Sequence, residues 1–492
     1  MRKVSVFIIA VFGALQLGAP VTFAQSDPQM PRDAGHQDKI AELEAGLRPA
    51  YGIAGEDPTV WSLEERMEYH NVPGVSIAVA IDGKLAWAKA YGVADKNDGR
   101  PIDTETLFQA ASLSKPVASL TGLALVQDGL LTLDAPVNSV LKRWQIPDND
   151  LTRKQPVTLR HLMSHRAGTT IHGFRGYKPG DVIPTLPQIL GGAPPANTKP
   201  VIVDQLPGAR YRYSGGGYTV LQLAIEDAIG QKFSDVVEGR LFHPAGMTRS
   251  NFDYPATDTN IAIGHRGDSA SSMNGNMLSY PELAAAGLWT TPKELLTLGS
   301  LVARARKSGN FILEAPLARQ MVPDSANDAG LGFGLNDPGD GVAFVHSGHN
   351  PGYSARWINY ADGRMSVVVL TNSDSGGALI REILSGLGDI YGWRQDAYQE
   401  RSIAALNEEE LASAVGRYAF DPDAEPVAVV TREGERLWIE GALVDRSRFL
   451  PQTASRFFVT KGLNFELERD GNGRVNALSV EGEIRLVKLV DG

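Results

Sequence analysis

The apolar positions of this chain change period along its length, and the changes predict strands at both ends of one large domain. Residues 74–95, GVSIAVAIDGKLAWAKAYGVAD, form two apolar runs around Asp82 and Gly83, which predicts a β-hairpin. Both runs are nearly apolar, so we expect that sheet to be covered on both faces. Residues 355–374, ARWINYADGRMSVVVLTNSD, predict a second hairpin around another Asp-Gly pair.

A helical period occupies most of the chain outside these hairpins. The expected helices are 37–45, 62–69, 115–127, 134–144, 158–168, 218–230, 232–246, 292–306 and 378–393. Residues 169–209 are rich in Gly and Pro, and such a long irregular stretch is more often a functional loop than filler. Strands, then many helices, then strands with a closing helix indicate an α+β fold.

The pattern changes again after about residue 404. Residues 426–441 and 464–489 alternate polar and apolar positions, with Gly-containing turns between the runs. Short strands at regular spacing predict a small all-β domain, an antiparallel barrel or sandwich. We therefore expect residues 25–403 to form one domain and residues 404–492 a second.

The first 24 residues have the pattern of a secretory signal peptide. Arg2 and Lys3 precede an apolar run, and Thr22 and Ala24 are small residues before the expected cut at Gln25. A membrane anchor is the alternative, but the apolar run is short for a span. We expect a periplasmic or secreted protein without a stable membrane anchor after cleavage.

The composition of the chain excludes several kinds of reactive site and partner. With 492 residues, of which 43% are hydrophobic and 21% charged, the chain is typical of globular proteins. It contains no cysteine, which excludes disulfides, thiol nucleophiles and thiolate metal sites. The net charge of −10 argues against nucleic acid as a partner. A small molecule or short peptide is the expected substrate.

Ser112 and Lys115, in FQAASLSKPVASL, are candidates for a nucleophile and its base. Pro116 is tolerated only in the first turn of a helix, so the helix must start at about residues 112–114. Ser112 would then lie among free N–H groups at the helix N-terminus, with Lys115 about one turn later on the same face. The apolar flanks supply the burial that a lysine needs to act as a base. The alternative is an N-cap serine with no catalytic role.

A second serine–lysine pair of the same spacing, Ser139 and Lys142, shows that spacing alone decides nothing. This pair lies among polar and charged residues such as Asn138 and Arg143, on a helix expected to face solvent. We expect no catalytic role for it.

The ordered motifs resemble the serine β-lactamases and penicillin-binding-protein-like hydrolases of class C type, over about residues 60–395. The first motif is SLSK, 112–115. The second is RYRYSGGGYTVLQ, 210–222, with Tyr213 in the tyrosine position, and the third is HSG, 346–348. The resemblance implies an antiparallel sheet flanked by helices, with a helical subdomain. The C-terminal part resembles the lipocalin-like barrel of some members.

The resemblance also implies roles for individual residues. Ser112 would attack a carbonyl carbon and form an acyl-enzyme. Lys115 and Tyr213 would share the role of base, and Tyr213 would also protonate the leaving group. The backbone N–H groups of Ser112 and His349 would form the oxyanion hole. His346 would orient substrate beside the reacting atoms.

Two positions depart from the family pattern. Gly215 stands where penicillin-recognising members carry an asparagine, and His346 stands where they carry a lysine. Gly215, Ser347 and Gly348 are the expected substrate-binding positions. We expect an exported serine hydrolase acting on a small ester, amide or D-amino-acid peptide, in preference to an efficient β-lactamase. The alternative is a weak or inactive binding or sensing protein on the same fold.

His161 and His165 could bind a metal ion, because they are four residues apart on an expected helix. No glutamate stands between them as in a zinc-peptidase motif, and the family resemblance explains the stretch as framework. We therefore expect neither a metal nor another cofactor. The oligomeric state has no signal in the sequence.

Overall fold

The computed structural model describes residues 35–57, 59–255, 257–267, 271–273, 277–422, 424–442, 444–481 and 484–489. The predicted signal peptide, residues 1–24, lies outside the described residues. All helices and strands named below belong to one compact unit, Asp33–Gly492. Within the described ranges, none of the helices has the length and apolar character needed to cross a bilayer.

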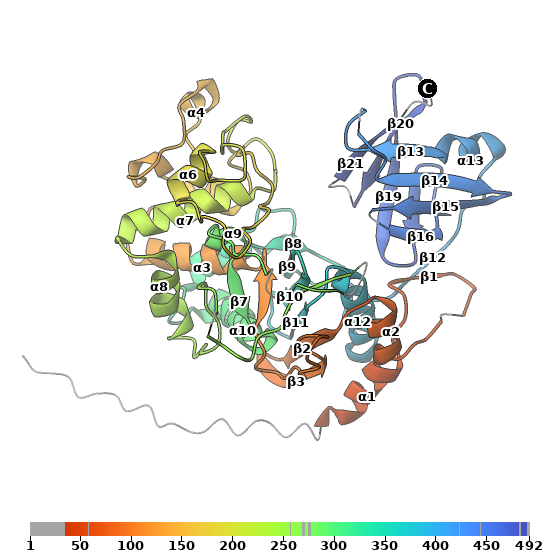
Figure 1. Ribbon diagram of the computed structural model, residues 1–492, viewed down its shortest axis with the longest axis horizontal. Coiled ribbons are helices and arrows are strands. Elements are labelled where there is room, and N and C mark those ends of the chain that lie inside the picture. The colour runs from red at the N-terminus through yellow and green to blue at the C-terminus, as the bar shows by residue number, and fades with distance from the viewer. Residues whose placement is uncertain are drawn as a thin grey trace, which may run out of the picture. The chain divides into compact units, whose positions relative to one another are not determined.

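An antiparallel sheet built from both ends of the larger domain forms its centre (Figure 1). Its strands are β2 (Gly74–Ile81), β3 (Lys84–Gly92), β8 (Gly334–Asn336), β9 (Ala343–Asn350), β10 (Tyr353–Tyr360) and β11 (Met365–Thr371). Their order in the sheet is β3-β2-β11-β10-β9-β8. Strand β2 pairs with β11, with Val79 opposite Val367. Both predicted hairpins are confirmed, and the α+β expectation with them.

Strand β3 departs from the expectation of a sheet buried on both faces. Seven of the eight residues of β2 are buried, whereas Trp87 is the single buried residue of β3. Strand β3 is the outermost strand, so no further strand shields its far edge. The expectation holds for β2 and is wrong for β3.

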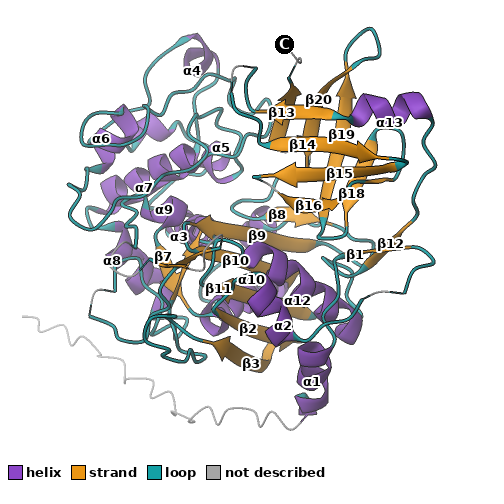
Figure 2. Ribbon diagram, turned by 45° about the vertical axis from the view of Figure 1, so that its right-hand side comes forward, coloured by secondary structure: helices purple, strands orange, loops and turns teal. Residues whose placement is uncertain are grey.

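Helices cover both faces of this sheet (Figure 2). On one face, Ile77 and Val367 share an apolar cluster with α1 (Gln37–Ala45), α2 (Leu63–Tyr69) and α12 (Gly376–Tyr391). On the other face, Ala78 and Val368 share a larger cluster with α3 (Ser114–Gln127), α7 (Gly215–Ile229) and α10 (Pro292–Ser308). The faces differ because successive residues of a strand point to opposite sides. The second face carries Lys115 of α3 and the side of β9 on which His346 and Gly348 lie.

The expected helix at 134–144 is wrong. That segment contains a 3-10 turn at Val137–Ser139 and otherwise runs as loop. The backbone N–H groups of Lys142 and Arg143 donate to the carboxylate of Asp227, at 2.6 Å and 3.1 Å. Those donors are therefore satisfied by a side chain on α7 instead of by helical carbonyls.

Two further helices are shorter than the pattern predicts. The segment 158–168 is helical only as α5 (Leu159–Met163), because the backbone at His165 has a positive φ of 56°. The segment 232–246 forms α8 (Phe233–Val237) and then a π-helical turn at Glu238–Phe242. The loop 169–209 is irregular as expected, apart from α6 (Leu186–Gly191).

The C-terminal region is an antiparallel, nearly closed barrel, as predicted. Its strands are β13 (Gly416–Ala419), β14 (Ala428–Glu433), β15 (Arg436–Gly441), β16 (Val444–Arg448), β17 (Leu450–Pro451), β18 (Arg456–Val459), β19 (Leu463–Arg469), β20 (Val475–Val480) and β21 (Ile484–Lys488). Their order is β16-β15-β14-β13-β21-β20-β19-β18-β17. An apolar cluster of its own fills the barrel, and α13 (Glu408–Ala414) packs against it. The boundary between residues 403 and 404 stays a prediction.

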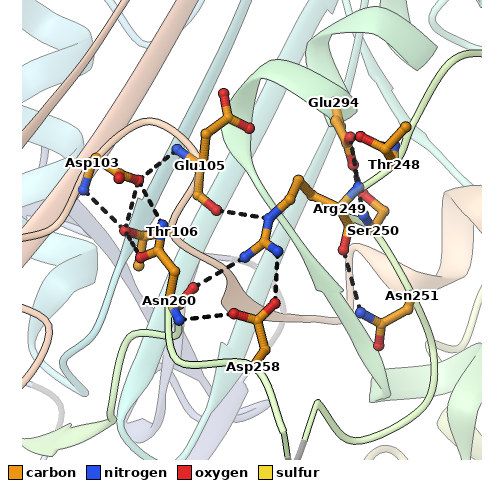
Figure 3. A network of polar contacts seen from close by, with 10 residues as sticks. All are labelled: Asp103, Glu105, Thr106, Thr248, Arg249, Ser250, Asn251, Asp258, Asn260 and Glu294. Atoms are coloured by element: carbon orange, nitrogen blue, oxygen red, sulfur yellow. Dashed lines mark hydrogen bonds and ion pairs between the residues drawn. The ribbon is translucent and has the colours of Figure 1, made fainter.

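A two-stranded sheet of β4 (Phe108–Ala111) and β7 (Leu288–Thr290) leads directly into Ser112. A polar network braces the loops beside it (Figure 3). Arg249 donates to the carbonyl oxygen of Glu105 at 3.1 Å and to the carboxylate of Asp258 at 2.6 Å. The carboxylate of Glu294, in the first turn of α10, accepts the backbone N–H groups of residues 248–250. The network ties the start of α10 to residues 248–250, in the loop that follows the π-helical turn.

Candidate active site

Ser112 lies in the sharp turn between β4 and α3. Ala111, the last residue of β4, has a positive φ of 50°, which is uncommon for a residue with a side chain. The Lys115 N–H donates to the Ser112 carbonyl oxygen at 3.0 Å, which closes the first turn of α3. Helix α3 starts at Ser114, so the helix start inferred from Pro116 is confirmed.

Lys115 is directed back toward Ser112. Its side-chain Nζ lies 3.0 Å from Ser112 Oγ and donates to the carbonyl oxygen of Ala285 at 2.7 Å. The residue is only 2% exposed, and burial lowers the pKa of Lys115 to about 7. A lysine with this pKa is partly neutral near pH 7, so it can accept the proton of the serine hydroxyl.

Ser139 and Lys142 are not arranged in this way. Ser139 Oγ donates to the carbonyl oxygen of Pro136 in an exposed position, at 2.7 Å. Lys142 Nζ donates to the carbonyl oxygen of Asp227 at 2.5 Å. Both side chains donate to backbone carbonyl oxygens, so this pair lacks the serine–lysine hydrogen bond that joins Ser112 and Lys115.

Tyr213 lies beside Lys115, immediately before α7. Lys115 Nζ is 4.8 Å from the centre of the Tyr213 ring. The ring also stacks on His165, with 4.3 Å between centres, and contacts His172 at 4.9 Å. The following residue, Ser214, caps α7 by accepting the Gly217 N–H at 2.9 Å. The helix cap therefore fixes the main chain just after the tyrosine.

Strand β9 brings the third motif to the same place. Residues of β9 alternate between the two faces of the sheet, so His346 and Gly348 lie on the face with α3 and α7. A Cβ on Gly348 would lie 2.3 Å from the carbonyl oxygen of Ala110. Only glycine permits β9 to approach β4 this closely. The approach brings the backbone that leads to His349 alongside the turn of Ser112.

His346 is close enough to Tyr213 to share the site, with 6.1 Å between ring centres. Its Nδ1 donates to the carbonyl oxygen of Ser347 at 2.7 Å. Burial and the nearby Lys115 charge lower the pKa of His346 below its usual value. The imidazole is thus neutral near pH 7 and can donate or accept a hydrogen bond. It carries no positive charge with which to bind a substrate carboxylate.

The side chains of Ser347 and His349 lie on the opposite face of β9. Ser347 Oγ accepts a hydrogen bond from Arg356 on β10 at 2.8 Å, and His349 Nδ1 lies 3.5 Å from Ser354 Oγ. These two side chains therefore face away from Ser112. Their backbone groups, not their side chains, are the parts of Ser347 and His349 that can meet a substrate.

Gly215 is packed against the loop that the Gly and Pro content marked as functional. A Cβ at Gly215 would lie 3.0 Å from the ring of Phe174 and 3.1 Å from the carbonyl oxygen of His172. The Gly215 N–H donates to that same carbonyl at 2.9 Å. Phe174 and His172 thus occupy the space into which an asparagine side chain would extend. No local pattern in the sequence indicates Phe174, because its contact with Gly215 joins a loop to a distant helix.

No group of three or more His, Cys, Asp or Glu side chains is placed to hold a metal ion among the residues that the structure describes. His161 and His165 have separate partners: His161 Nδ1 accepts the Thr158 N–H at 3.3 Å, and His165 Nδ1 accepts the Ser214 N–H at 3.0 Å. His165 instead contacts Tyr213, a relation that its sequence position did not indicate.

The sequence of this chain is similar to those of known serine hydrolases and penicillin-binding proteins. The model of the Beta-lactamase family matches residues 62–384. Penicillin-binding protein 4* of Bacillus subtilis (strain 168) is 26% identical over 448 residues, covering 82% of this chain and 90% of that protein. A D-aminopeptidase of Cereibacter sphaeroides is 26% identical over 324 residues, 62% of this chain and 57% of that protein. Esterase EstB of Burkholderia gladioli is 28% identical over 224 residues, 40% of this chain and 55% of that protein.

Solved structures share the fold. The octameric penicillin-binding protein homologue from Pyrococcus abyssi has a TM-score of 0.57 at 21% identity, covering 87% of this chain and 98% of that one. The D-amino acid amidase from Ochrobactrum anthropi SV3, complexed with L-phenylalanine, has a TM-score of 0.54 at 22% identity, covering 66% and 96%. These similarities confirm the β-lactamase-like architecture expected from the motifs.

Proposed function

The chain belongs to the beta-lactamase family and is a serine hydrolase, and we propose that it cleaves small esters or amides with Ser112 as nucleophile. The observation that carries the proposal is the 3.0 Å contact between Lys115 Nζ and Ser112 Oγ, together with the burial that lowers the pKa of the lysine. A serine hydroxyl needs an adjacent base to become a nucleophile, and Lys115 is that base.

The proposed reaction has two stages. Ser112 Oγ bonds to the substrate carbonyl carbon while its proton passes to Lys115, with Tyr213 sharing that proton. The backbone N–H groups of Ser112 and His349 stabilise the oxyanion, and collapse of the intermediate breaks the bond to an alcohol or amine that leaves with a proton. A water molecule then attacks the acyl-enzyme by the reverse proton path and regenerates Ser112.

We propose that the acyl group carries a free amine or no amide, as in D-amino acid amides or simple esters. Asparagine at the position of Gly215 would donate to a substrate amide, whereas Gly215 has no side chain and Phe174 fills the neighbouring space. Relatives named D-aminopeptidase and esterase support these two substrate classes. A β-lactam with an acylamino group would lack its hydrogen-bond donor here.

A fluorophosphonate probe tests the enzyme proposal directly. We expect the wild-type protein to be labelled on Ser112 and the Ser112→Ala variant to remain unlabelled, with Ser139→Ala labelled like wild type. Intact-protein mass spectrometry reads out the adduct. Unlabelled wild type, or equal labelling of Ser112→Ala, would overturn the proposal in favour of a binding or sensing protein on this fold.

A substrate panel tests the proposed acyl group. It comprises p-nitrophenyl esters, D-alanine p-nitroanilide, its L-enantiomer and nitrocefin. We expect turnover of esters or of the D-amino acid anilide, with nitrocefin the poorest substrate by kcat/KM. Nitrocefin as the best substrate would contradict the role assigned to Gly215 and Phe174.

We further propose that the protein is exported after removal of residues 1–24. The basic start, the apolar run and the small residues at the expected cut support this location. N-terminal sequencing of the protein from a periplasmic or secreted fraction should start at Gln25. An uncut chain retained in the cytoplasm would refute export.

A further inference from the structure

His165 occupies a conformation that few residues tolerate. It follows α5 with a positive φ of 56° and is 7% exposed. A left-handed backbone at a residue other than glycine costs free energy, and it persists only when the surroundings fix it. The contacts that fix His165 lie on the segment that carries Tyr213.

His165 binds the main chain on both sides of Tyr213. Its carbonyl oxygen accepts the N–H of Arg212 at 2.8 Å, and its Nδ1 accepts the N–H of Ser214 at 3.0 Å. One residue therefore holds the backbone donors immediately before and immediately after the tyrosine. A rotation of the Tyr213 backbone would break one or both of these hydrogen bonds.

The His165 ring also supports the Tyr213 side chain. The two rings are stacked, with 4.3 Å between centres and 27° between planes. The imidazole also contacts the rings of Tyr218 and Tyr211, with 5.1 Å and 5.7 Å between ring centres. Tyr218 is held in turn by Ser119 at 2.9 Å. The stack thus continues from α3 and α7 to the phenol of Tyr213.

The hydrogen bond to Ser214 also fixes the protonation state of His165. A backbone N–H can only donate, so Nδ1 must be the bare, accepting nitrogen, and protonation of Nδ1 would break the bond. Burial and the charges of Lys115, His346 and His172 lower the pKa of His165 well below its usual value, in the same direction. The neutral ring adds no positive charge that would oppose protonation of Lys115 during the reaction.

We propose that His165 is a positioning residue for Tyr213, holding the main chain on both sides of the tyrosine and stacking against its phenol ring. The inference rests on the proposed function, because it gives Tyr213 a part in proton transfer. His165 itself contacts no reacting atom and acts only through Tyr213. Small displacements of a proton-transfer group are costly, since a shift of ~1 Å can lower a rate about 100-fold.

The test is a double-mutant cycle of His165→Asn and Tyr213→Phe. Asparagine tolerates a positive φ and keeps an acceptor near the position of Nδ1, but it removes the stacked ring. We expect His165→Asn to slow fluorophosphonate labelling of Ser112 about 10- to 100-fold, and kcat for esters by a similar factor with KM changed less than about threefold. In the Tyr213→Phe background, the same change should slow labelling less than about threefold.

His161→Asn is the matched control, because His161 Nδ1 also accepts a backbone N–H, that of Thr158, away from Tyr213. It should label at the wild-type rate. Should His165→Asn fail to fold by circular dichroism, His165→Gly, which adopts a positive φ without strain and also removes the ring, keeps the cycle measurable. Equal slowing in both backgrounds would show a merely structural role, and no slowing at all would show no role; either result overturns the inference. Unlabelled wild type would instead refute the proposed function.

Discussion

At the scale of single residues, the site depends on how far each side chain is removed from water. Lys115 and Lys142 have the same spacing from a serine, yet only Lys115 is buried. Burial disfavours the ammonium form, which lowers the pKa of Lys115 toward neutrality. Burial, and not the serine–lysine spacing, therefore makes Lys115 suitable as a base.

The first prediction concerns pH. The base must be neutral, so acylation should be lost as the pH falls below the Lys115 pKa of about 7 and reach a plateau above it. Lys115→Arg keeps the charge at every pH and should lower kcat/KM by ~10²–10⁴-fold. Labelling rates between pH 5 and 9 check both statements. Lys142→Arg is the control and should leave the profile unchanged; a flat wild-type profile across pH 7 would contradict the assignment.

The second prediction concerns Gly215. Gly215→Asn should destabilise the protein by about 1–3 kcal/mol, because the new side chain overlaps the Phe174 ring. Phe174→Ala in the same chain should recover part of that loss and raise kcat/KM for nitrocefin about tenfold, since the amide then has room to donate. Denaturant unfolding and nitrocefin kinetics measure the two effects.

Gly377→Asn provides the matched control for this substitution. Gly377 also lies in the first turn of a helix, α12, but nothing stands within 4 Å of its potential Cβ. The control should change stability by less than about 0.5 kcal/mol. Equal destabilisation at both positions would mean that the helix start, and not Phe174, resists a side chain.

At the level of elements, β4 and β7 position the turn that carries Ser112, and a polar network lies beside them. Asn251 exchanges backbone hydrogen bonds with Trp289 of β7, at 3.0 Å and 2.9 Å. Residues 248–250, just before Asn251, are bound by Glu294 at the start of α10. A carboxylate near a helix N-terminus also interacts favourably with the helix dipole.

The third prediction concerns the contribution of Glu294 to stability. Glu294→Ala leaves the N–H groups of residues 248–250 without their acceptor, so the free energy of unfolding should fall by about 2 kcal/mol. Chemical denaturation measures the loss, and Glu68→Ala, an exposed glutamate on α2, should change stability by less than about 0.5 kcal/mol. A Glu294→Ala variant as stable as wild type would mean that water replaces the carboxylate without cost.

At the scale of the whole molecule, the chain has separate apolar cores for the hydrolase sheet and the barrel. Between β12 (Gln399–Arg401) and α13, residues 402–407 form no helix or strand, and Ile403 is 39% exposed. The Ala404 N–H donates to the carbonyl oxygen of Pro451 at 2.9 Å, whereas residues 402, 403, 405 and 407 are exposed. An exposed connecting segment without helix or strand is a preferred site of proteolysis.

The fourth prediction follows from these separate cores. Brief proteolysis should cut within residues 402–407 and leave two resistant fragments, identified by mass spectrometry. Residues 404–492 expressed alone should give a β-sheet circular dichroism spectrum and a cooperative thermal transition, because the barrel core is internal to that segment. Degradation of the barrel fragment without a stable product would show that its fold depends on the larger domain, and would move the predicted boundary.

Several features of the fold follow from chemistry between residues that are neighbours in the chain, and these were predicted correctly. Pro116 set the start of α3, the Asp-Gly pairs set the hairpin turns, and the alternating pattern identified the barrel strands. Each depends on neighbours within a few residues, where proline geometry and strand period act directly. The pattern failed at 134–144 and after Met163, where Asp227 and the contacts of His165 took the backbone out of the helix.

Contacts between side chains from distant segments became known from the folded chain alone. The burial of Lys115, the stacking of His165 on Tyr213 and the packing of Phe174 against Gly215 join segments that are distant in the chain. No local period encodes such contacts, because they arise from the close packing of a whole core. The sequence therefore identified the family and a candidate nucleophile, and the fold supplied the burial of Lys115, the support of Tyr213 and the packing around Gly215.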